Sequence, residues 1–415
     1  MTKTTNTTGT TIDDQVAILM EGAEFGDDQI EETMARELRA RLVEARAQGR
    51  PLRAYCGYDA TRPDLHLGHS ITLRKLRQFQ DLGHEAIFVV GDFTTRVGDP
   101  SDHDGLRPQL GREEIAANAR TYAEQAYKIL DRARSQVRYN SEWLEALNLG
   151  DVIQIAGNFT VQQFLARDNF QARYQKGAPI WLHELFYALL QGYDAVALRT
   201  DVQLGATEQL FNLLAGRKLQ EAFGQPPQVC LTFPVLVGTD GRRRMSKSAG
   251  NYIGLAEAPD VIYGKVMSLP DEVMADYFRL VTRWPAGEVA ALEADLAAGR
   301  LHPMAAKKRL AWEIVDCYHG AEAAGAAARR FERVHQRGEL PDEMPRFSLA
   351  DPLPLPDLLV AAGLCRSKSQ GRRLVQQGGV RLDGQRVDEV DRIVPPAEAV
   401  LQVGKRRFVR LIPGG

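Results

Sequence analysis

Cysteine is scarce in this sequence and is nowhere paired in a recognisable motif. Only four cysteines occur in 415 residues, at Cys56, Cys230, Cys317 and Cys365, with no C-x-x-C pair and no histidine cluster at zinc spacing. This pattern argues against a disulfide framework and against a structural metal site. It favours a reducing compartment, and we expect a cytoplasmic protein.

Long apolar runs and an excess of one charge are missing too. No stretch is long enough to span a membrane, so we expect no membrane association. The first ten residues are polar, rich in threonine and without the apolar core of a signal peptide, which predicts a disordered tail. The net charge is only −2, but residues 357–415 hold eleven Lys/Arg against six Asp/Glu, a local charge of +5. Positive charge is therefore concentrated at one end.

What the sequence does contain is typical of a globular chain of two or three domains, with 44% hydrophobic and 26% charged residues. Apolar runs predict strands at 52–58, 86–91, 137–140, 195–198 and 229–237, separated by helical stretches that include 113–133. Such alternation predicts an α/β fold, a doubly wound, Rossmann-like parallel sheet. Residues 141–192 are predicted to form a largely helical insertion in it.

The remaining boundaries follow from changes in composition. Residues 1–50 are predicted to form a tail and helices, and 51–257 the sheet domain. Residues 258–344, rich in alanine and leucine, predict a helical domain, and 345–356, with four prolines, a linker. Residues 357–415 predict a small α+β module with two helices and a hairpin at Asp383-Gly384. Its basic helix face suits RNA phosphates, although a merely solvated face is an equal alternative.

One strand–turn–helix segment carries the first chemical signal. After the strand at 52–58, Pro63 breaks the chain, and an amphipathic helix begins that carries His66 and His69 on one face of its first turn. Gly68 between them leaves room for another molecule. A helix N-terminus of this kind suits a phosphate-bearing ligand, but two surface histidines would give the same pattern.

A second signal lies far downstream, in Gly241-Arg-Arg-Arg-Met-Ser-Lys-Ser-Ala-Gly-Asn251. Four cations, two hydroxyls and two glycines share one loop, which could close over a triphosphate and neutralise charge on the leaving pyrophosphate. A localisation-like basic patch is the alternative, but it does not explain Met-Ser-Lys-Ser after a strand.

Together, His66-Leu-Gly-His69 and Arg244-Met-Ser-Lys-Ser248 resemble the paired signatures of class I aminoacyl-tRNA synthetases. Tyr187, Gln191 and Asp194 lie at i, i+4 and i+7 of one predicted helix, and with Tyr55 and Gln209 they resemble the tyrosyl-tRNA synthetases. The basic C-terminal segment resembles the S4-type RNA-binding module of bacterial members, which tryptophanyl relatives typically lack.

The resemblance implies ATP-dependent attachment of L-tyrosine to tRNA(Tyr) through a tyrosyl-adenylate, in a homodimer formed through the 141–192 insertion. It implies Mg²⁺ that enters with ATP, no dedicated metal site, and an anticodon-binding role for the helical domain. The catalytic positions it implies are Thr61, His66, His69, Arg244 and Lys247. The implied tyrosine-binding positions are Tyr55, Asp99, Tyr187, Gln191, Asp194 and Gln209. Further ATP-binding positions are Gly57, Asp59, Gly68, Thr72, Gly205, Glu208, Met245, Ser246 and Ser248, and RNA-binding positions are Lys368, Arg372 and Arg373.

Three places depart from the family's usual pattern. Arg244 replaces a more common lysine, which keeps the charge and changes its geometry. Ala206 and Glu208 stand where glycine and aspartate are usual, at positions implied to contact the ATP ribose. Thr95-Arg96 and Asp102-His-Asp104 depart from a loop that is normally glycine-rich and basic.

These departures leave two alternatives open. One is a paralogue that activates a tyrosine analogue or serves a resistance role. The other is a non-catalytic RNA-binding regulator with a synthetase fold, which predicts broken signature residues, whereas His66, His69, Lys247 and Asp194 are all present.

Overall fold

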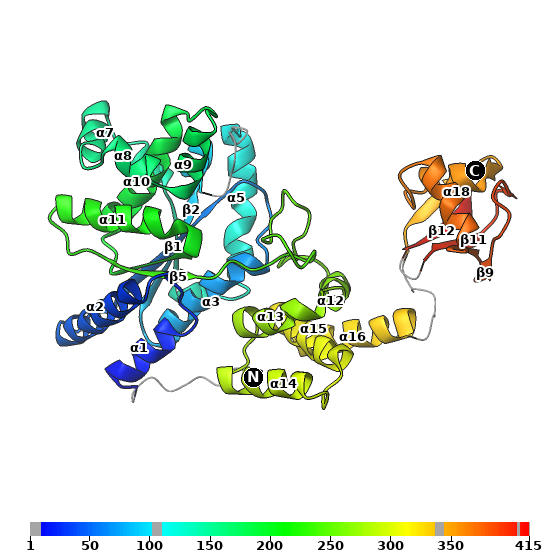
Figure 1. Cartoon of the computed structure of the whole chain (residues 1–415), viewed down its shortest axis with the longest axis horizontal. Helices are drawn as coiled ribbons and strands as arrows, with labels where there is room; N and C mark the ends of the chain where they lie inside the picture. Colours follow the sequence, from blue (N-terminus) through cyan, green and yellow to red (C-terminus); the bar gives the residue numbers. More distant parts are fainter. Residues whose placement is uncertain (1–9, 102–109, 337–343, 405–406, 415) are drawn as a thin grey trace. The chain divides into compact units, whose positions relative to one another are not determined.

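The computed structural model describes residues 10–101, 110–336, 344–404 and 407–414 (Figure 1). The expected disordered tail lies almost entirely outside these residues, as does the departing segment Asp102-His-Asp104. The chain divides into two compact units, residues 1–321 and 322–415, and each is described by itself.

The first unit is built on a five-stranded sheet in the order β3-β2-β1-β4-β5, in which every neighbouring pair is parallel. The strands are β1 (Arg53–Asp59), β2 (Glu85–Gly91), β3 (Ser135–Tyr139), β4 (Val202–Ala206) and β5 (Val229–Phe233). The predicted doubly wound parallel sheet is confirmed. Strand order reverses between β1 and β4, and the carboxyl ends of strands at such a switch point are where open α/β sheets bind ligands.

Helices cover both faces of this sheet. Tyr58 of β1 bonds Thr72 of α3 (Leu67–Asp81), with 2.7 Å between the two hydroxyl oxygens, so α3 packs on one face. On the other face Tyr55, Ile87 and Val89 pack against Ala195 and Leu198 of α10 (Leu182–Leu198). Both faces of β1 are therefore buried, which explains its continuous apolar and aromatic sequence.

Two glycines fix the position of α10 against its neighbour α11 (Leu210–Ala222). A Cβ on Gly192 would lie 3.1 Å from backbone atoms of Ala215 and Gly216, and one on Gly216 would meet the Gln228 side chain at 2.7 Å. Only residues without a side chain permit this approach. The backbone contact thereby sets where the functional face of α10 stands.

The predicted strand at 195–198 is wrong, because Ala195–Leu198 is the last turn of α10. A short apolar run fits a buried helix as well as a buried strand, and here the helix continues until Arg199 adopts a left-handed φ of 49°. The strand of this region is β4, Val202–Ala206, which the sequence did not predict because glutamine and glycine interrupt its apolar run.

Other helices of the first unit surround the sheet or fill the insertion. Those outside the insertion are α1 (Ile12–Met20), α2 (Asp28–Ala47), α4 (Thr94–Val97) and α5 (Arg112–Ala126). The insertion at 141–192 contains α6 (Ser141–Leu144), α7 (Leu149–Ala156), α8 (Val161–Leu165), α9 (Asp168–Gln175) and the start of α10. Helix α5 is shorter than the predicted 113–133, because it ends at Ala126, and a separate 3-10 turn at Arg132–Arg134 leads into β3.

The alanine-rich region is helical, as predicted. Its helices are α12 (Pro259–Met267), α13 (Met274–Val281), α14 (Ala286–Ala297), α15 (Pro303–His319) and α16 (Ala321–Phe331), followed by a π-helical turn at 332–336. Within the first unit, α12 packs on α15 and α13 packs on α3. Tyr277, Phe278, Leu310 and Ile314 have no exposed surface.

The second unit contains a five-stranded sheet in the order β6-β12-β11-β8-β9. Its elements are β6 (Arg346–Leu349), β7 (Leu353–Pro354), α17 (Leu355–Ala361), α18 (Lys368–Gln376), β8 (Val380–Leu382), β9 (Gln385–Arg386), β10 (Ile393–Val394), β11 (Ala399–Val403) and β12 (Arg407–Pro413). The predicted hairpin is confirmed: Asp383 and Gly384 have φ angles of 50° and 78° between β8 and β9.

The predicted linker at 345–356 is wrong, because β6 pairs in parallel with β12 and Leu349 is buried in the core of this unit. Leu355 is buried there as well. The prolines do not prevent this, since they lie outside β6 or at the start of α17, where proline is tolerated. In the described part of the chain no helix is long and apolar enough to cross a bilayer.

Candidate active site

Two histidines shape the N-terminus of α3. His66 is the N-cap residue, and its Nδ1 accepts the backbone N–H of Gly68 at 3.1 Å. Nδ1 of His69 accepts the backbone N–H of His66 at 3.1 Å, and the two ring centroids are 3.9 Å apart. A Cβ on Gly68 would lie 3.0 Å from the His66 ring, so this packing requires glycine.

Both imidazoles are neutral at physiological pH. Burial, followed by the positive charges of Lys247 and Arg244, lowers the pKa of His66 to about 3. Burial, followed by His66 and then by Lys247 and Arg244, holds the pKa of His69 well below its usual value. Since each Nδ1 accepts a backbone N–H, the proton of each neutral ring sits on Nε2. The helix start therefore offers two N–H donors without a formal charge.

The segment that directly follows the basic loop 241–251 is joined to this helix start, and the loop itself is bonded to neighbouring elements. The backbone N–H of Leu67 donates to Ile253 O at 3.0 Å, and that of Leu255 donates to Leu65 O at 2.9 Å. Nζ of Lys247 donates to the Tyr122 hydroxyl at 3.1 Å and to Arg62 O at 3.3 Å. The two sequence signatures, predicted to act together, thus meet in space.

Asn251 and Met245 hold the loop in shape. The Asn251 side chain accepts from Ser246 N at 2.9 Å and donates to Arg244 O at 3.0 Å. Met245 is buried, and its N–H donates to Leu236 O at 2.7 Å. The hydroxyls of Ser246 and Ser248 lie 3.3 Å apart. The Asn251 side chain thus cross-links the two ends of the loop through backbone hydrogen bonds.

Arg244 reaches across the site to Glu208, which lies in a 3-10 turn (η3, Thr207–Gln209) after β4. Its Nη1 lies 2.7 Å from each carboxylate oxygen of Glu208. Two of the positions at which the sequence departs from the family's usual pattern, 208 and 244, are therefore partners.

A buried polar pocket lies between β1 and α10. The Tyr55 hydroxyl is fully buried and has no hydrogen-bond partner within normal distance among the described residues. Its pKa is raised well above the usual value by burial and then by the negative charge of Asp194, with Gln228 opposing. Burial raises the pKa of Asp194 to about 8. Buried polar groups of this kind require partners, which marks a ligand site.

Two residues that the sequence did not single out hold Asp194. Nε1 of Trp143 donates to its Oδ1 at 2.8 Å, and Nδ2 of Asn140 donates to its Oδ2 at 3.4 Å. Both donors oppose the effect of burial on its pKa. Asn140 directly follows β3 and Trp143 lies in α6. Position at the carboxyl end of a parallel strand is the one sequence signal that could have found them.

The other predicted tyrosine-binding residues form two contacts beside this pocket. The Tyr187 hydroxyl donates to Oδ2 of Asp59 at 3.1 Å, and the Thr94 hydroxyl donates to Oδ1 of Asp59 at 2.7 Å. Asp59 thus contacts a residue of the predicted tyrosine site, although the sequence had assigned it to ATP.

The second contact is that of Gln209, whose Nε2 donates to Oδ2 of Asp99 at 2.7 Å. Oε1 of Gln191 is buried without a partner among the described residues. The six predicted positions therefore gather on β1, α10 and the segments that follow α4 and β4.

Three predicted ATP-binding positions have different surroundings. The Thr72 hydroxyl bonds Tyr58 and donates to His69 O at 3.2 Å, so the fold already occupies it. A Cβ on Gly205 would meet Leu213 at 3.0 Å, which gives this glycine a packing reason. Gly57, by contrast, is exposed within β1, and a Cβ there would meet nothing within 4 Å. Of these three residues, only Gly57 has free space beside it that a bound ligand could occupy.

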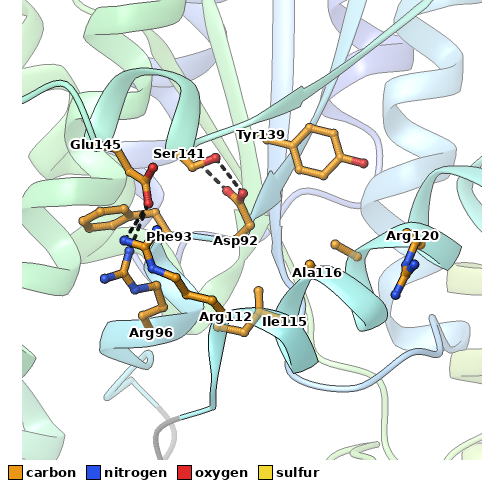
Figure 2. Close-up of a pocket in the computed structure, with 11 residues that line it drawn as sticks. Asp92, Phe93, Arg96, Arg112, Ile115, Ala116, Arg120, Tyr139, Ser141 and Glu145 are labelled. Carbon is orange, nitrogen blue, oxygen red and sulfur yellow. Dashed lines mark hydrogen bonds and ion pairs between the residues drawn. The ribbon is translucent and has the colours of Figure 1, made fainter.

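A separate hollow of about 380 Å³ lies between α5 and the ends of β2 and β3 (Figure 2). Its lining residues are Asp92, Phe93, Arg96, Arg112, Ile115, Ala116, Ala119, Arg120, Tyr139, Ser141 and Glu145. Arg96 and Arg112 share the carboxylate of Glu145, at 3.2 and 3.1 Å, and Asp92 accepts from Ser141. None of the predicted site residues lines this hollow.

The predicted RNA-binding residues lie on α18 in the second unit. Lys368, Arg372 and Arg373 are all exposed. Lys368 pairs with Asp357, and Arg372 lies 3.5 Å from Asp391. The helix face is basic but partly neutralised by neighbouring carboxylates.

Comparison with known proteins finds matches to two protein families along the chain. Residues 47–336 match the family described as tRNA synthetases class I (W and Y), and residues 353–400 match the S4 domain. The tyrosine–tRNA ligase of Moorella thermoacetica is 52% identical over 377 residues, which cover 90% of this chain and 91% of that protein. The tyrosine–tRNA ligase of Thermotoga maritima is 48% identical over 364 residues, which cover 88% and 91%.

Solved structures show the same fold at lower identity. A truncated mitochondrial tyrosyl-tRNA synthetase of Aspergillus nidulans aligns with a TM-score of 0.60 at 20% identity, covering 78% of this chain and 94% of that one. The tyrosyl-tRNA synthetase of Archaeoglobus fulgidus, solved with L-tyrosine, aligns with a TM-score of 0.58 at 23% identity, covering 77% and 100%.

Proposed function

The chain belongs to the tyrosine–tRNA ligases of the class I tRNA synthetase family, and we propose that it attaches L-tyrosine to tRNA(Tyr) with ATP. The observation that carries the proposal is the buried pair of polar groups on β1 and α10. Tyr55 and Asp194 are both buried, Tyr55 packs among apolar side chains, and no described residue bonds its hydroxyl. A phenol hydroxyl is the substrate group that would satisfy both.

This pair would also provide the selectivity. In our proposal Tyr55 and Asp194 hydrogen-bond the phenol of the substrate, while Trp143 and Asn140 hold the carboxylate in place. Phenylalanine fills the same space but offers no hydroxyl, so the buried Tyr55 hydroxyl stays unpaired, at a cost of about 1–3 kcal/mol. Asp194 then gains no bond beyond those from Trp143 and Asn140. Tyrosyl-tRNA synthetases are the standard example of rejection by an unpaired hydrogen bond.

The backbone end of the substrate would lie toward the ends of β1 and β4. We assign the α-ammonium to Tyr187, Gln191 and Asp99, and the carboxylate to the neighbourhood of Gln209. The buried, unpartnered Oε1 of Gln191 supports this assignment, since an ammonium donor would satisfy it. The contact between Gln209 and Asp99 supports it too, because it holds two of the proposed ligands together.

ATP would bind between the start of α3 and the basic loop. The Nε2–H groups of His66 and His69 would donate to phosphate oxygens, with Thr61 beside them and the helix N-terminus adding its partial positive charge. Lys247 and Arg244 would neutralise the charge on the pyrophosphate from the loop, next to Ser246 and Ser248. Mg²⁺ would enter as part of the ATP complex.

The reaction follows from this placement. A carboxylate oxygen of tyrosine attacks the α-phosphorus of ATP, the bond from that phosphorus to its bridging oxygen breaks, and pyrophosphate leaves. A ribose hydroxyl at the end of the tRNA then attacks the carbonyl of the adenylate and AMP leaves. Neither step needs a protein nucleophile, because positioning and charge stabilisation lower both barriers.

The second unit would supply tRNA contacts. We propose that Lys368, Arg372 and Arg373 bind backbone phosphates, as the match to the S4 domain and their exposure support. The helical region 258–344 would bind the anticodon arm. Since its substrate is tRNA and its cysteines are free thiols, we propose a cytoplasmic location.

We also propose a homodimer formed through the insertion 141–192. Among the described residues twelve large apolar side chains are exposed, and six of them lie between 149 and 182. These are Leu149, Ile153, Val161, Tyr174, Trp181 and Leu182. Exposed apolar groups concentrated on one segment suit a subunit interface.

Tyrosine-dependent exchange between ATP and pyrophosphate tests the first step, and charging of tRNA(Tyr) tests the second. We expect both with tyrosine and neither with phenylalanine at comparable concentration. Exchange with another amino acid only would overturn the tyrosine assignment. Exchange without charging would instead favour the paralogue that activates a tyrosine analogue.

A further inference from the structure

The basic loop is attached to the site on two sides. On one side Lys247 donates to Arg62 O, in the turn after β1, and to the hydroxyl of Tyr122 in α5. On the β4 side Arg244 contacts both carboxylate oxygens of Glu208 at 2.7 Å. The side-chain hydrogen bonds of Asn251 are internal to the loop, and the hydrogen bond of Met245 joins the loop to Leu236, in the segment before it. The Arg244–Glu208 pair ties the loop to the end of β4.

The chemistry of the pair suits a positioning contact. A carboxylate alone beside a triphosphate site would repel the nucleotide, whereas a guanidinium held against it removes that repulsion. The side chains of Arg244 and Glu208 are 39% and 25% exposed, so each remains within reach of solvent and ligand. The backbone of Glu208 is also held in place, because the 3-10 turn η3 that contains it continues directly into helix α11.

We propose that Glu208 is a positioning residue that acts through Arg244 and holds the basic loop over the phosphate site. The family resemblance implied instead that position 208 contacts the ATP ribose. In our proposal the glutamate serves the nucleotide indirectly: Glu208 sets where Arg244 stands, and Arg244 meets the phosphates. This inference rests on the proposed ATP-dependent function for its consequence in catalysis, but the attachment of the loop is a property of the protein alone.

The first test needs no substrate. The loop contains trypsin sites at Arg242, Arg243, Arg244 and Lys247, and fragments cut there are identified by mass spectrometry in limited digestion of the full chain. We expect Glu208→Gln to raise the rate of cleavage in this loop at least threefold. The matched control is Glu257→Gln, because Glu257 pairs with Lys265 and has a side-chain exposure of 23% without reaching β4. Equal cleavage of E208Q, E257Q and the unaltered chain would overturn the attachment.

The second test separates a loop role from a ribose role. In tyrosine-dependent exchange at saturating tyrosine, we expect Glu208→Gln to raise KM for ATP about fivefold with a smaller effect on kcat. The same factor is expected with 2′-deoxy-ATP and 3′-deoxy-ATP. If the effect of E208Q disappears with either deoxynucleotide, Glu208 acts on the ribose and the proposal is wrong.

A double-mutant comparison makes the dependence on Arg244 explicit. Arg244→Gln removes both the attachment and a cation, so E208Q added to R244Q should change KM for ATP by less than twofold. Independent, multiplying effects would contradict the proposal. If the unaltered chain shows no tyrosine-dependent exchange, the proposed function fails, whereas the trypsin comparison still decides the attachment.

Discussion

The amino-acid pocket and the ATP side of the site differ in how far the protein encloses them. In the pocket, Tyr55 and Asp194 are 0% and 3% exposed, and Trp143 and Asn140 hold the carboxylate. On the ATP side, Arg244 and Glu208 belong to loops and their side chains face solvent in part. In our proposal, selection of the amino acid thus rests on buried groups, and the handling of phosphate rests on an attached loop.

This difference has a physical reason. A hydrogen bond discriminates strongly only where its loss leaves a group unpaired away from water, so selectivity requires burial. A triphosphate must enter, react and leave as pyrophosphate, so its ligands need access and long, charged side chains. We therefore expect changes in the pocket to act on tyrosine, and changes in the loop to act on ATP.

The largest effect is expected from Asp194→Ala. In our proposal, removing the carboxylate leaves the phenol of tyrosine without one of its two buried hydrogen-bond partners. We expect kcat/KM for tyrosine to fall roughly 100-fold, as a loss of about 3 kcal/mol implies. KM for ATP should change less than twofold. Pyrophosphate exchange with each substrate varied in turn measures both, and a comparable loss for ATP would show that the two regions are not separable.

Trp143→Phe is expected to have a smaller effect at the same place. It removes one donor to the Asp194 carboxylate and keeps the aromatic bulk. We expect kcat/KM for tyrosine to fall by up to about tenfold, because a hydrogen bond contributes about 0.5–1.5 kcal/mol. Since that donor opposes burial, the pKa of Asp194 should rise further above 8. A variant with unchanged tyrosine kinetics would leave Trp143 with a packing role only.

The pH dependence of ATP use probes the loop. Burial lowers the pKa of Lys247 to about 8, so its charged form is present below pH 8 and is lost as pH rises through 8. At saturating tyrosine, kcat/KM for ATP should fall about fivefold between pH 8 and pH 9, since this parameter reports the free enzyme. The pKa of His66, about 3, predicts no acid limb from this residue near pH 6.5.

Lys247→Arg is the matched variant for this profile, because a guanidinium keeps its charge throughout this range. Its absolute rate is expected to be lower, but its decline should begin at a higher pH. If the decline near pH 8 persists unchanged in K247R, another group controls the profile.

The smallest effect on the first step is expected in the second unit. Arg372→Gln should leave tyrosine-dependent exchange unchanged and raise KM for tRNA roughly threefold, with a weaker dependence of that KM on salt. Charging assays over a range of salt concentrations measure this. A loss of exchange in R372Q would mean that this helix supports the catalytic unit.

Sequence patterns predicted the parts of this site that are local. The strand at 52–58, the helix start with His66 and His69, and the face of Tyr187, Gln191 and Asp194 all follow from spacing within one element, and the structure contains them. The signature pair also indicated correctly that the loop with Lys247 meets that helix start.

Tertiary contacts could not be predicted in the same way. Trp143 and Asn140 reach Asp194 across more than fifty residues, and the only sign in their own segment is its position at the carboxyl end of a strand. Arg244 and Glu208 were noted singly as departures, but their pairing depends on the folded loop. The misassigned strand at 195–198 has a different cause, since four apolar residues carry no period that separates a helix end from a strand.

The central claim is that amino-acid selection and ATP handling are separable, and one set of rates tests it most directly. The ratio of kcat/KM for tyrosine to that for phenylalanine is measured in pyrophosphate exchange, together with KM for ATP, in the unaltered chain, Asp194→Ala and Glu208→Gln. We predict that D194A lowers the ratio and keeps KM for ATP, whereas E208Q keeps the ratio and raises KM for ATP. If both variants change both quantities to the same extent, the claim is contradicted.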